Sequence, residues 1–376
     1  MAGQSETLTN QFFDLCRTYF TEPDISFRDQ AKKMGISHPI FIRKVKTAFK
    51  EGYLILRAPH AETMSRGLNR KLSELAPGGR HIESYVVEVT DDDSFAYSAA
   101  ERVLSLLKEI LKDDGKEEVN LGLVSGTTTT KTITQLVKGR FWEEHMHDVQ
   151  IRSKKINIMA LDISPVFHGE DLSYNAVNTV LRLYAWLKEK LGERGCEVIP
   201  YQLGSASIDV KAKEEEFKSN RANYDVLKYA DPGRLDGSDA PSRLDMVITS
   251  IGSPTKSLLQ TIIHSLHVDL KDQLAGDLLF YPLDAEGQEV PLKTKDGEDY
   301  LVYSALRLKT IRRMVEDRRA KIILIARDTL QQTGGGKGKQ EIVEVDKHKA
   351  ILAATRGGYY NELITDVSTA TKLMRE

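Results

Sequence analysis

From about residue 85 onward, the chain alternates short apolar runs with amphipathic segments of helical period. Short apolar runs bounded by polar positions predict buried strands, and apolar residues at three- and four-residue spacing predict helices that cover them. The strands are expected at 85–89, 120–124, 156–161, 197–200, 246–250, 321–326 and 363–364, and the main helices at 94–111, 129–138 and 174–191. This alternation predicts an α/β fold with a doubly wound, largely parallel, Rossmann-like sheet.

The beginning of the chain has a different pattern. Helices are expected at 11–20 and 26–34, Gly35 then interrupts the chain, and apolar residues recur at helical spacing between 40 and 49. Two helices joined by a short glycine turn have the outline of a helix-turn-helix. The alternating residues 53–57 predict a strand, which would make this small head winged-helix-like.

We therefore expect three parts: a helix-turn-helix domain at 1–58, a linker at 59–80 that is partly helical, and a ligand-binding α/β domain at 81–376. The charge distribution agrees with this division. Residues 1–80 hold 13 Lys and Arg against 8 Asp and Glu, whereas the whole chain has a net charge of -2. A basic head on an acidic body is typical of a small nucleic-acid-binding module attached to a domain of another kind.

The second helix of the predicted helix-turn-helix carries a basic face opposite its apolar one. Cationic and polar side chains on one helix face suit contacts with phosphates and base edges in the major groove of DNA. The candidate DNA-binding residues are Ser37, His38, Arg43, Lys44 and Lys46. We predict that this basic face binds double-stranded operator DNA. The alternative is that the face is solvated and has no partner.

A threonine-rich turn follows the predicted strand at 120–124. Ser125, Gly126, Thr127 and Thr128 combine small residues, which let a ligand approach the backbone, with hydroxyl groups and the unpaired amides of a helix start. The turn has neither the spacing of a P-loop nor a GxGxxG fingerprint. It is a candidate cradle for an anionic group, and threonines that merely cap a helix are the alternative.

The last thirty residues contain three motifs in a fixed order: Lys347 with Ala350 and Ile351, then Gly357-Gly358, then Leu363-Ile-Thr-Asp366 before a short apolar helix. This order resembles the carboxyl end of the SorC-type sugar-sensing transcription regulators. The segment ISFRDQAKKMGIS with RKVKTAFKEGYLIL resembles their DNA-binding head. The resemblance implies a head that binds DNA and an isomerase-like domain that binds a sugar or sugar phosphate without turnover.

The same resemblance implies further effector-binding residues and an oligomeric state. Gly252 would lie against the ligand through its backbone, Lys347 would be a charged partner for a phosphate or a hydroxyl, and Arg327, where the family more often has small residues, would be an additional anion ligand. Regulators of this outline are generally homo-oligomers, dimers or tetramers, and the effector would shift the equilibrium between two assemblies. The resemblance is loose between 201 and 244, where a charged insertion departs from the pattern.

An enzyme of the sugar-phosphate isomerase or deaminase class, with an accessory amino-terminal domain, is the alternative function. Its chemistry needs a carboxylate base, for which Asp162 at the end of a strand is the candidate. We expect no enzyme activity and no cofactor. We also expect no metal, since the histidines lack the spacing of metal ligands. Two distant cysteines predict a cytoplasmic setting, and no apolar run approaches the length of a membrane span.

Overall fold

The structure is a computed structural model of the chain, and its described residues form two compact units. One unit comprises Met1–Arg57 with Lys138–Arg140, and the other comprises Ala58–Val137 with Phe141–Glu376. The described residues are 26–50, 60–89, 91–139, 141–146, 151, 153–163, 174–204, 214–254, 257–266, 270, 273–294, 297–300, 302, 304–335 and 339–376.

The smaller unit contains α2 (Phe27–Lys33) and α3 (His38–Lys50), joined by a tight turn. Gly35 adopts φ +65° in this turn, and the amides of Gly35 and of the next residue donate to carbonyls in the last turn of α2. This is a Schellman turn, whose left-handed position favours glycine. Phe41 and Val45 of α3 are buried, so one face of the helix packs inward and the other is left to solvent.

These two helices confirm the pair predicted at 26–34 and 40–49. The helix predicted at 11–20 and the strand predicted at 53–57 lie outside the described residues, and remain predictions.

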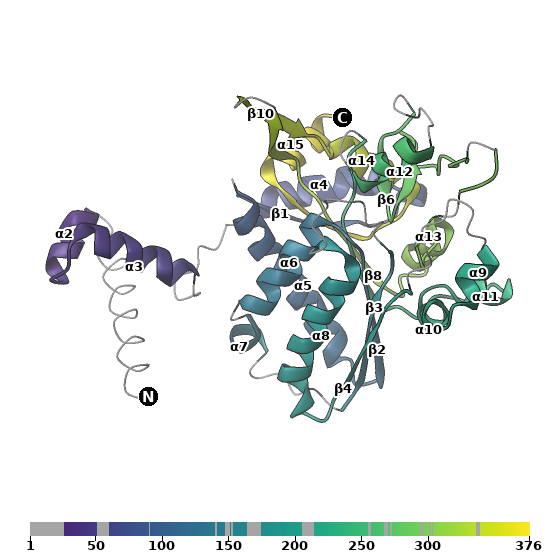
Figure 1. Ribbon diagram of the computed structural model, residues 1–376, viewed down its shortest axis with the longest axis horizontal. Helices are drawn as coiled ribbons and strands as arrows, with labels where there is room; N and C mark the ends of the chain where they lie inside the picture. Colours follow the sequence, from purple (N-terminus) through teal and green to yellow (C-terminus); the bar gives the residue numbers. More distant parts are fainter. Residues whose placement is uncertain are drawn as a thin grey trace. The chain divides into compact units, whose positions relative to one another are not determined.

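The larger unit is built on a seven-stranded sheet in the order β1-β11-β8-β5-β2-β3-β4, and all neighbouring strands are parallel (Figure 1). The predicted doubly wound α/β fold is therefore confirmed. The strands are β1 (Glu83–Val87), β2 (Glu118–Leu123), β3 (Lys155–Ala160), β4 (Glu197–Tyr201), β5 (Met246–Thr249), β8 (Lys321–Ile325) and β11 (Glu362–Asp366).

Both faces of the sheet are buried, and strand β8 illustrates why the strands read as continuous apolar runs. Ile322 and Leu324 belong to one hydrophobic cluster, while Ile323 and Ile325 belong to a second cluster on the other face. Successive side chains of a strand point to opposite faces, so a strand covered on both sides is apolar at every position. The sheet is thus the middle layer of three.

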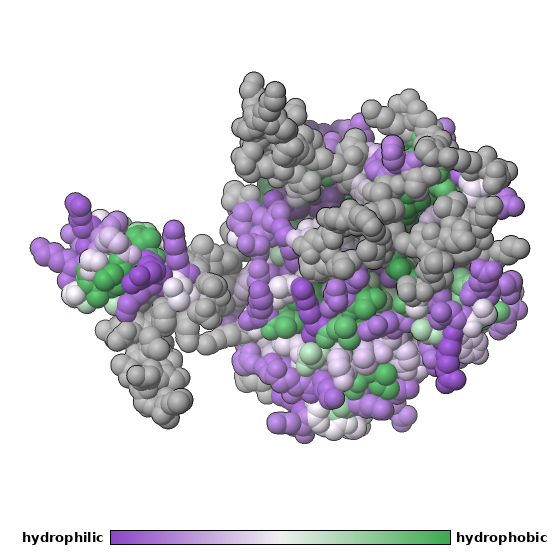
Figure 2. Space-filling model, in the orientation of Figure 1, coloured by the Kyte–Doolittle hydropathy of each residue, from purple (hydrophilic) through white to green (hydrophobic). Residues whose placement is uncertain are grey.

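Helices from different parts of the chain form the two outer layers (Figure 1). The second cluster includes side chains of α5 (Asp92–Lys112), α6 (Thr127–Lys138), α7 (Phe141–His145) and α8 (Ala176–Gly192). The first cluster includes side chains of α4 (Glu62–Leu75), α10 (Arg221–Ala230), α12 (Leu258–Leu266), α13 (Leu308–Glu316), α14 (His348–Gly357) and α15 (Val367–Arg375). Figure 2 shows one face of the larger unit, where hydrophilic side chains surround smaller hydrophobic areas.

The segment expected as a linker at 59–80 contains α4, which packs against the sheet. Leu68 and Leu72 of this helix are fully buried in the first cluster. The Ser65 hydroxyl accepts a hydrogen bond of 3.0 Å from the Val86 amide of β1. Residues 62–75 are therefore part of the larger unit in their packing, and the chain divides at Arg57 and Ala58.

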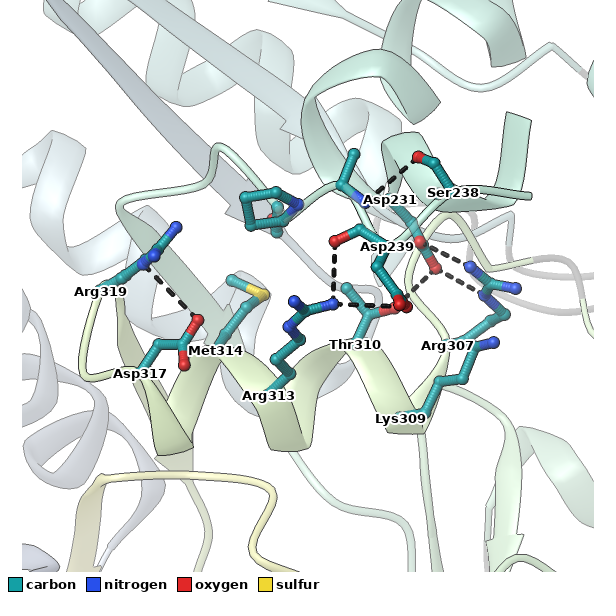
Figure 3. Close-up of a pocket in the computed structure, with 14 residues that line it drawn as sticks. Asp231, Ser238, Asp239, Arg307, Lys309, Thr310, Arg313, Met314, Asp317 and Arg319 are labelled. Atoms are coloured by element: carbon teal, nitrogen blue, oxygen red, sulfur yellow. Dashed lines mark hydrogen bonds and ion pairs between the residues drawn. The ribbon is translucent and has the colours of Figure 1, made fainter. Parts of the chain in front are cut away.

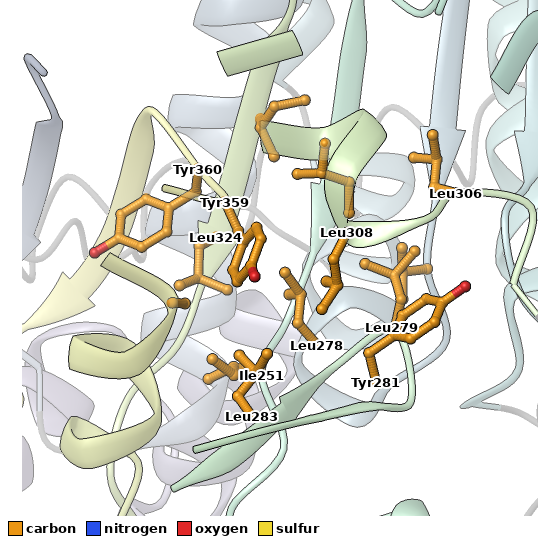
Figure 4. Close-up of a cluster of buried hydrophobic side chains, with 14 of the residues drawn as sticks. Ile251, Leu278, Leu279, Tyr281, Leu283, Leu306, Leu308, Leu324, Tyr359 and Tyr360 are labelled. Atoms are coloured by element: carbon orange, nitrogen blue, oxygen red, sulfur yellow. The ribbon is translucent and has the colours of Figure 1, made fainter. Parts of the chain in front are cut away.

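Three irregular additions accompany the sheet. The hairpin of β6 (Gly276–Leu278) and β7 (Tyr281–Leu283) contributes to the first cluster, and Figure 4 shows its Leu278, Tyr281 and Leu283 in the cluster to which Leu324 of β8 belongs. A second hairpin pairs β9 (Thr329–Gly335) with β10 (Lys339–Val345). The insertion at 201–244 contains α9 (Glu214–Ser219), α10 and α11 (Pro232–Asp236). No helix in the described part of the chain is long and apolar enough to span a membrane.

Candidate functional site

The sequence-predicted ligand residues meet at the carboxyl ends of the central strands. From β2 the chain continues to β3 and β4 on one side, whereas from β5 it continues to β8 and β11 on the other. Strands β2 and β5 therefore flank the point at which the winding direction reverses, where ligands of open α/β sheets bind. Ser125 follows β2 by two residues and Gly252 follows β5 by three.

The Ser125 side chain is occupied by Asp162, which follows β3. The Ser125 hydroxyl donates to Asp162 Oδ1 at 2.6 Å, and the Ser125 amide donates to both carboxylate oxygens at 3.0 and 3.1 Å. The Ser125 oxygen in turn accepts from the Ala176 amide at 2.9 Å, at the start of α8. Ser125 therefore orients a buried carboxyl group.

A second buried carboxyl group, that of Asp277, comes from the β6–β7 hairpin. Burial raises the pKa of Asp162 to about 7 against the lowering effect of the Ser125 hydrogen bonds, and the charge of Asp277 adds to the increase. Burial likewise raises the pKa of Asp277 to about 6, and the positive charge of Lys347 opposes that increase. Asp277 Oδ1 is buried without a hydrogen-bond partner among the described residues. Two buried carboxyl groups whose pKa values are raised toward neutrality thus lie at the site.

Two glycines make room for this arrangement. Gly252 forms a backbone bridge with Asp277, in which the Gly252 amide donates to the Asp277 carbonyl at 2.9 Å and the Gly252 carbonyl accepts from the Asp277 amide at 3.2 Å. A Cβ atom at Gly252 would lie 1.9 Å from Asp277 Oδ1. Gly126 has φ +144°, and a Cβ atom there would lie 2.5 Å from the Ser250 hydroxyl oxygen. Any other residue at these positions would displace the polar groups of the site.

Lys347 provides an ammonium group that no described residue hydrogen-bonds. The residue is half-buried by its surface area, and the ammonium lies deep enough that burial lowers its pKa. The charges of Asp277, Asp92 and Asp328 oppose this decrease. The Lys347 amide donates to Asp328 Oδ1 at 2.7 Å, which fixes the start of α14. An enclosed cation with carboxylates nearby but no hydrogen-bond acceptor of its own is suited to an incoming anion or hydroxyl group.

The start of α6 adds amide donors. Thr127 is exposed and Thr128 half-buried in the first turn of the helix, which contains no acidic residue. The Thr130 amide donates to the Gly126 carbonyl, so the amides before it precede the first intrahelical bond. Helix starts of this kind attract negative charge.

Arg327 lies near the site, but its charge is paired. Its guanidinium group is 3.1 Å from a carboxylate oxygen of Asp92 and 3.7 Å from one of Asp366, and it donates to the Asp91 carbonyl at 3.2 Å. The group also lies over the Phe95 ring, 5.4 Å from its centroid. The structure therefore gives Arg327 a role in joining α5 to β11, whereas its predicted role as an anion ligand remains a prediction.

The residues predicted to contact DNA lie in the smaller unit, at and after the turn into α3. Ser37, His38, Arg43 and Lys46 are exposed and Lys44 is half-buried. Phe41 and Val45 face inward, and the ring of Phe41 lies 5.8 Å from that of Phe27 in α2. The basic residues thus lie on the outer side of an amphipathic helix, as the sequence predicted.

Sequence reasoning named Asp162 but missed the rest of the acidic half of the site. Neither Asp277 nor Asp328 was among the predicted site residues. The available signal was an aspartate directly after Gly276. Asp328, Asp346 and His348 also place potential metal ligands within 4.8 Å of one another, but the Lys372 ammonium lies 2.6 Å from Asp328 Oδ2 and supplies a cation there.

Comparison with solved structures gives the fold a family context. The chain is similar to the full-length sorbitol operon regulator SorC of Klebsiella pneumoniae, with 16% identity, a TM-score of 0.51, and coverage of 97% of this chain and 98% of that one. It is also similar to a probable sor operon regulator of Shigella flexneri, with 16% identity, a TM-score of 0.53, and coverage of 84% and 99%. No protein-family model and no curated protein matches the sequence. The predicted resemblance to SorC-type regulators is confirmed at the level of the fold.

Proposed function

We propose that the chain is a DNA-binding regulator of transcription whose larger unit binds a sugar or sugar phosphate and is controlled by it. The observation that carries the proposal is the enclosed Lys347 ammonium, which has no hydrogen-bond acceptor among the described residues. This group belongs to the site at the carboxyl ends of β2 and β5, where the winding direction of the sheet reverses. The start of α6 would hold the anionic part of the effector with Lys347. The similar structures are those of a sorbitol operon regulator and a probable sor operon regulator, which supports the same function.

The carboxyl groups define how the remainder of the effector would be held. Asp277 Oδ1 lacks a partner, and Asp162 has one oxygen that accepts a single amide bond. Both can accept hydrogen bonds from sugar hydroxyls, which is a common use of buried carboxylates in ligand sites. Ser125, Gly126, Thr127, Thr128, Gly252 and Lys347 would thus form the effector site together with these two aspartates.

The effector can be tested by a thermal-shift screen over phosphorylated and free sugars. A ligand that binds only the folded state raises the unfolding temperature by mass action. Lys347→Met should remove this shift, while Lys349→Met, an exposed lysine two residues later on α14, should keep it. Equal shifts in both variants would contradict the assignment of Lys347.

DNA binding is tested by titrating the full chain onto the sequence upstream of its own operon, over a range of salt concentrations. Phosphate contacts predict that the logarithm of the affinity falls linearly with the logarithm of the salt concentration. Arg43→Ala or Lys46→Ala should each reduce that slope by about one. Lys112→Ala removes the same charge from an exposed site on α5 and should leave the slope unchanged. An affinity for DNA that does not change with salt concentration would refute the proposal.

Regulation requires that effector and DNA influence each other. If the effector changes the affinity for the operator by some factor, the operator must change the affinity for the effector by the same factor. We propose that a homo-oligomer, a dimer or tetramer, transmits this coupling. Measuring effector affinity with and without operator DNA tests the reciprocity, and sedimentation of the free chain tests the oligomer.

A second candidate function is catalysis on a sugar phosphate, which one observation favours. Asp162 has a pKa of about 7, the range expected for a general base at neutral pH. Incubation with sugar phosphates, followed by detection of isomerised or deaminated product, separates the two functions. Turnover that Asp162→Asn abolishes would replace the regulator proposal with the enzyme.

A further inference from the structure

A cavity lies elsewhere in the larger unit, and none of its described lining residues belongs to the proposed effector site. It has a volume of about 540 Å³ and lies among α9, α11, the β7 strand and the start of α13. Its wall includes Lys218, Arg234, Tyr281, Glu289, Tyr300 and Lys309. This volume is within the range of pockets that hold small molecules.

Most charges in this wall are already paired. Arg234 makes a bidentate pair with Glu214, at 2.6 and 2.7 Å, and lies over the Phe217 ring. Arg307 makes a bidentate pair with the buried Asp231, at 2.7 and 2.8 Å. These pairs hold α9, α11 and α13 in place, so the cavity has a wall that is set before any ligand arrives.

Three polar groups of the wall have no hydrogen-bond or ion-pair partner within the described residues. Tyr281 is only 6% exposed, and its hydroxyl points away from Leu278 and Leu283 in the core (Figure 4). Glu289 and Lys309 are exposed at the rim. A tyrosine that is buried this deeply normally finds a hydrogen-bond partner. The Tyr281 hydroxyl can therefore exchange hydrogen bonds with a molecule in the cavity.

The start of α13 adds donors to the same cavity. Arg307 is the N-cap residue of this helix and makes no side-chain capping bond, and the first turn contains no acidic residue. Leu308 and Lys309 of this first turn line the cavity. The Asp231 carboxylate already accepts a hydrogen bond of 2.8 Å from the Thr310 hydroxyl in this turn, so the Lys309 ammonium is the group that favours a negative charge in the cavity.

A smaller neighbouring pocket of about 220 Å³ shares Gly233, Arg307 and Lys309 with the cavity. Its other cations are engaged, as Figure 3 shows: Arg313 is held by Asp239 and Arg319 by Asp317. The unpaired groups are thus concentrated in the larger cavity, and Lys309 lies where the two meet.

From these observations we infer that the larger cavity is a second small-molecule site, for a hydroxylated anion such as a sugar acid or a sugar phosphate. The anionic group binds Lys309 and the start of α13. The hydroxyl groups donate to Glu289 and exchange hydrogen bonds with the Tyr281 hydroxyl. Val302 and Leu308 supply the apolar part of the wall. The site would give the protein a ligand besides the effector held at Lys347.

The inference is tested by calorimetry on the full chain with gluconate, glucose 6-phosphate and 6-phosphogluconate as probes. Glucose has only the hydroxyl groups and inorganic phosphate only the anionic group, so each should bind at least tenfold more weakly than the best probe. Tyr281→Phe should weaken that probe about tenfold, as the loss of one hydrogen bond to a ligand does. Glu289→Gln and Lys309→Met should also weaken it, while the exposed Tyr224→Phe should not.

Two further readouts separate this site from the effector site and from a folding defect. A probe held in the cavity loses affinity in Tyr281→Phe and keeps it in Lys347→Met, whereas a probe held at the effector site does the reverse. Because the Tyr281 hydroxyl has no hydrogen-bond partner among the residues that the structure describes, Tyr281→Phe should not lower the unfolding midpoint without ligand. The inference is overturned if no probe binds at millimolar concentration, or if every probe that binds responds only to Lys347→Met.

Discussion

Replacing Asp162 by asparagine tests the central electrostatic feature of the effector site. Asparagine keeps the shape of the side chain and an oxygen that can accept the Ser125 hydrogen bonds, but it cannot ionise. Asp162 is 1% exposed, so its negative charge is costly in the folded protein. The substitution therefore removes a destabilising charge that the folded state carries at high pH.

The magnitude follows from the pKa of Asp162, about 7 in the folded protein against an ordinary value of 3.8. Between these two values the folded state binds more protons than the unfolded state, so the free energy of unfolding falls as pH rises. The whole decrease amounts to about 4 kcal/mol, at about 1.4 kcal/mol for each pH unit between the two pKa values. Asp162→Asn should match the wild type near pH 4 and exceed its stability by up to about 4 kcal/mol above pH 7.

Urea unfolding at pH 4 to 8, followed by the fluorescence of Trp142 and Trp186, measures this difference. Both tryptophans are buried in the larger unit, so their emission reports its unfolding. Asp93→Asn, an exposed residue near the start of α5, is the matched control and should show no such gain. A difference between Asp162→Asn and wild type that stays constant with pH would refute the reasoning.

Three further variants probe the frame around the site. Gly252→Ala should destabilise the protein by about 1 to 3 kcal/mol in urea, because its Cβ would overlap Asp277, whereas Gly192→Ala, with open space around it, should be neutral or slightly stabilising. Leu72→Ala should cost about 2 to 5 kcal/mol, and a loss below 1 kcal/mol would mean that α4 is not part of the core. Glu362→Gln removes the buried carboxylate that pairs with the partly exposed Lys321 and Arg102 at 2.9 and 3.0 Å and should cost about 1 to 2 kcal/mol, and a neutral result in thermal unfolding would contradict that pairing.

The strands of the sheet could be predicted because a doubly covered strand leaves a plain signal. The run at 321–326, for example, became β8, since its residues fill both hydrophobic clusters. The order of the strands left no such signal. β11 lies between β1 and β8, and this depends on which long connections fold back over the sheet. Periodicity within an element contains no information on that choice.

The helix at 62–75 shows a second limit of sequence reasoning. Its surroundings contain Pro77, Gly78 and Gly79, which are typical of a linker, and its average composition is polar. Only one narrow stripe, with Leu68 and Leu72, is buried. A stripe this narrow is also found on solvated helices, so tertiary packing decided the outcome. The hairpin of β9 and β10 escaped prediction for a related reason, because its glycines obscured the alternating residues on either side.

Half of the candidate site could be predicted, because its residues directly follow strands. Ser125 and Gly252 come after β2 and β5, and carboxyl ends of parallel strands meet at one edge of a sheet. Asp277 comes instead from a hairpin that returns to this edge through its bridge with Gly252. That return is a long-range contact, which local spacing does not encode.

Ser125→Ala connects the predicted half of the site with the missed half. The substitution removes the hydroxyl that donates to Asp162 and leaves the backbone amide bonds intact. Because the hydroxyl bond favours the ionised carboxylate, its loss should raise the pKa of Asp162 above about 7. The pH at which stability stops falling should rise with it, in the same urea experiment, while Ser94→Ala at the start of α5 should leave it unchanged. If that pH does not move, Ser125 does not control the charge of Asp162, and its place in the effector site would rest on the backbone alone.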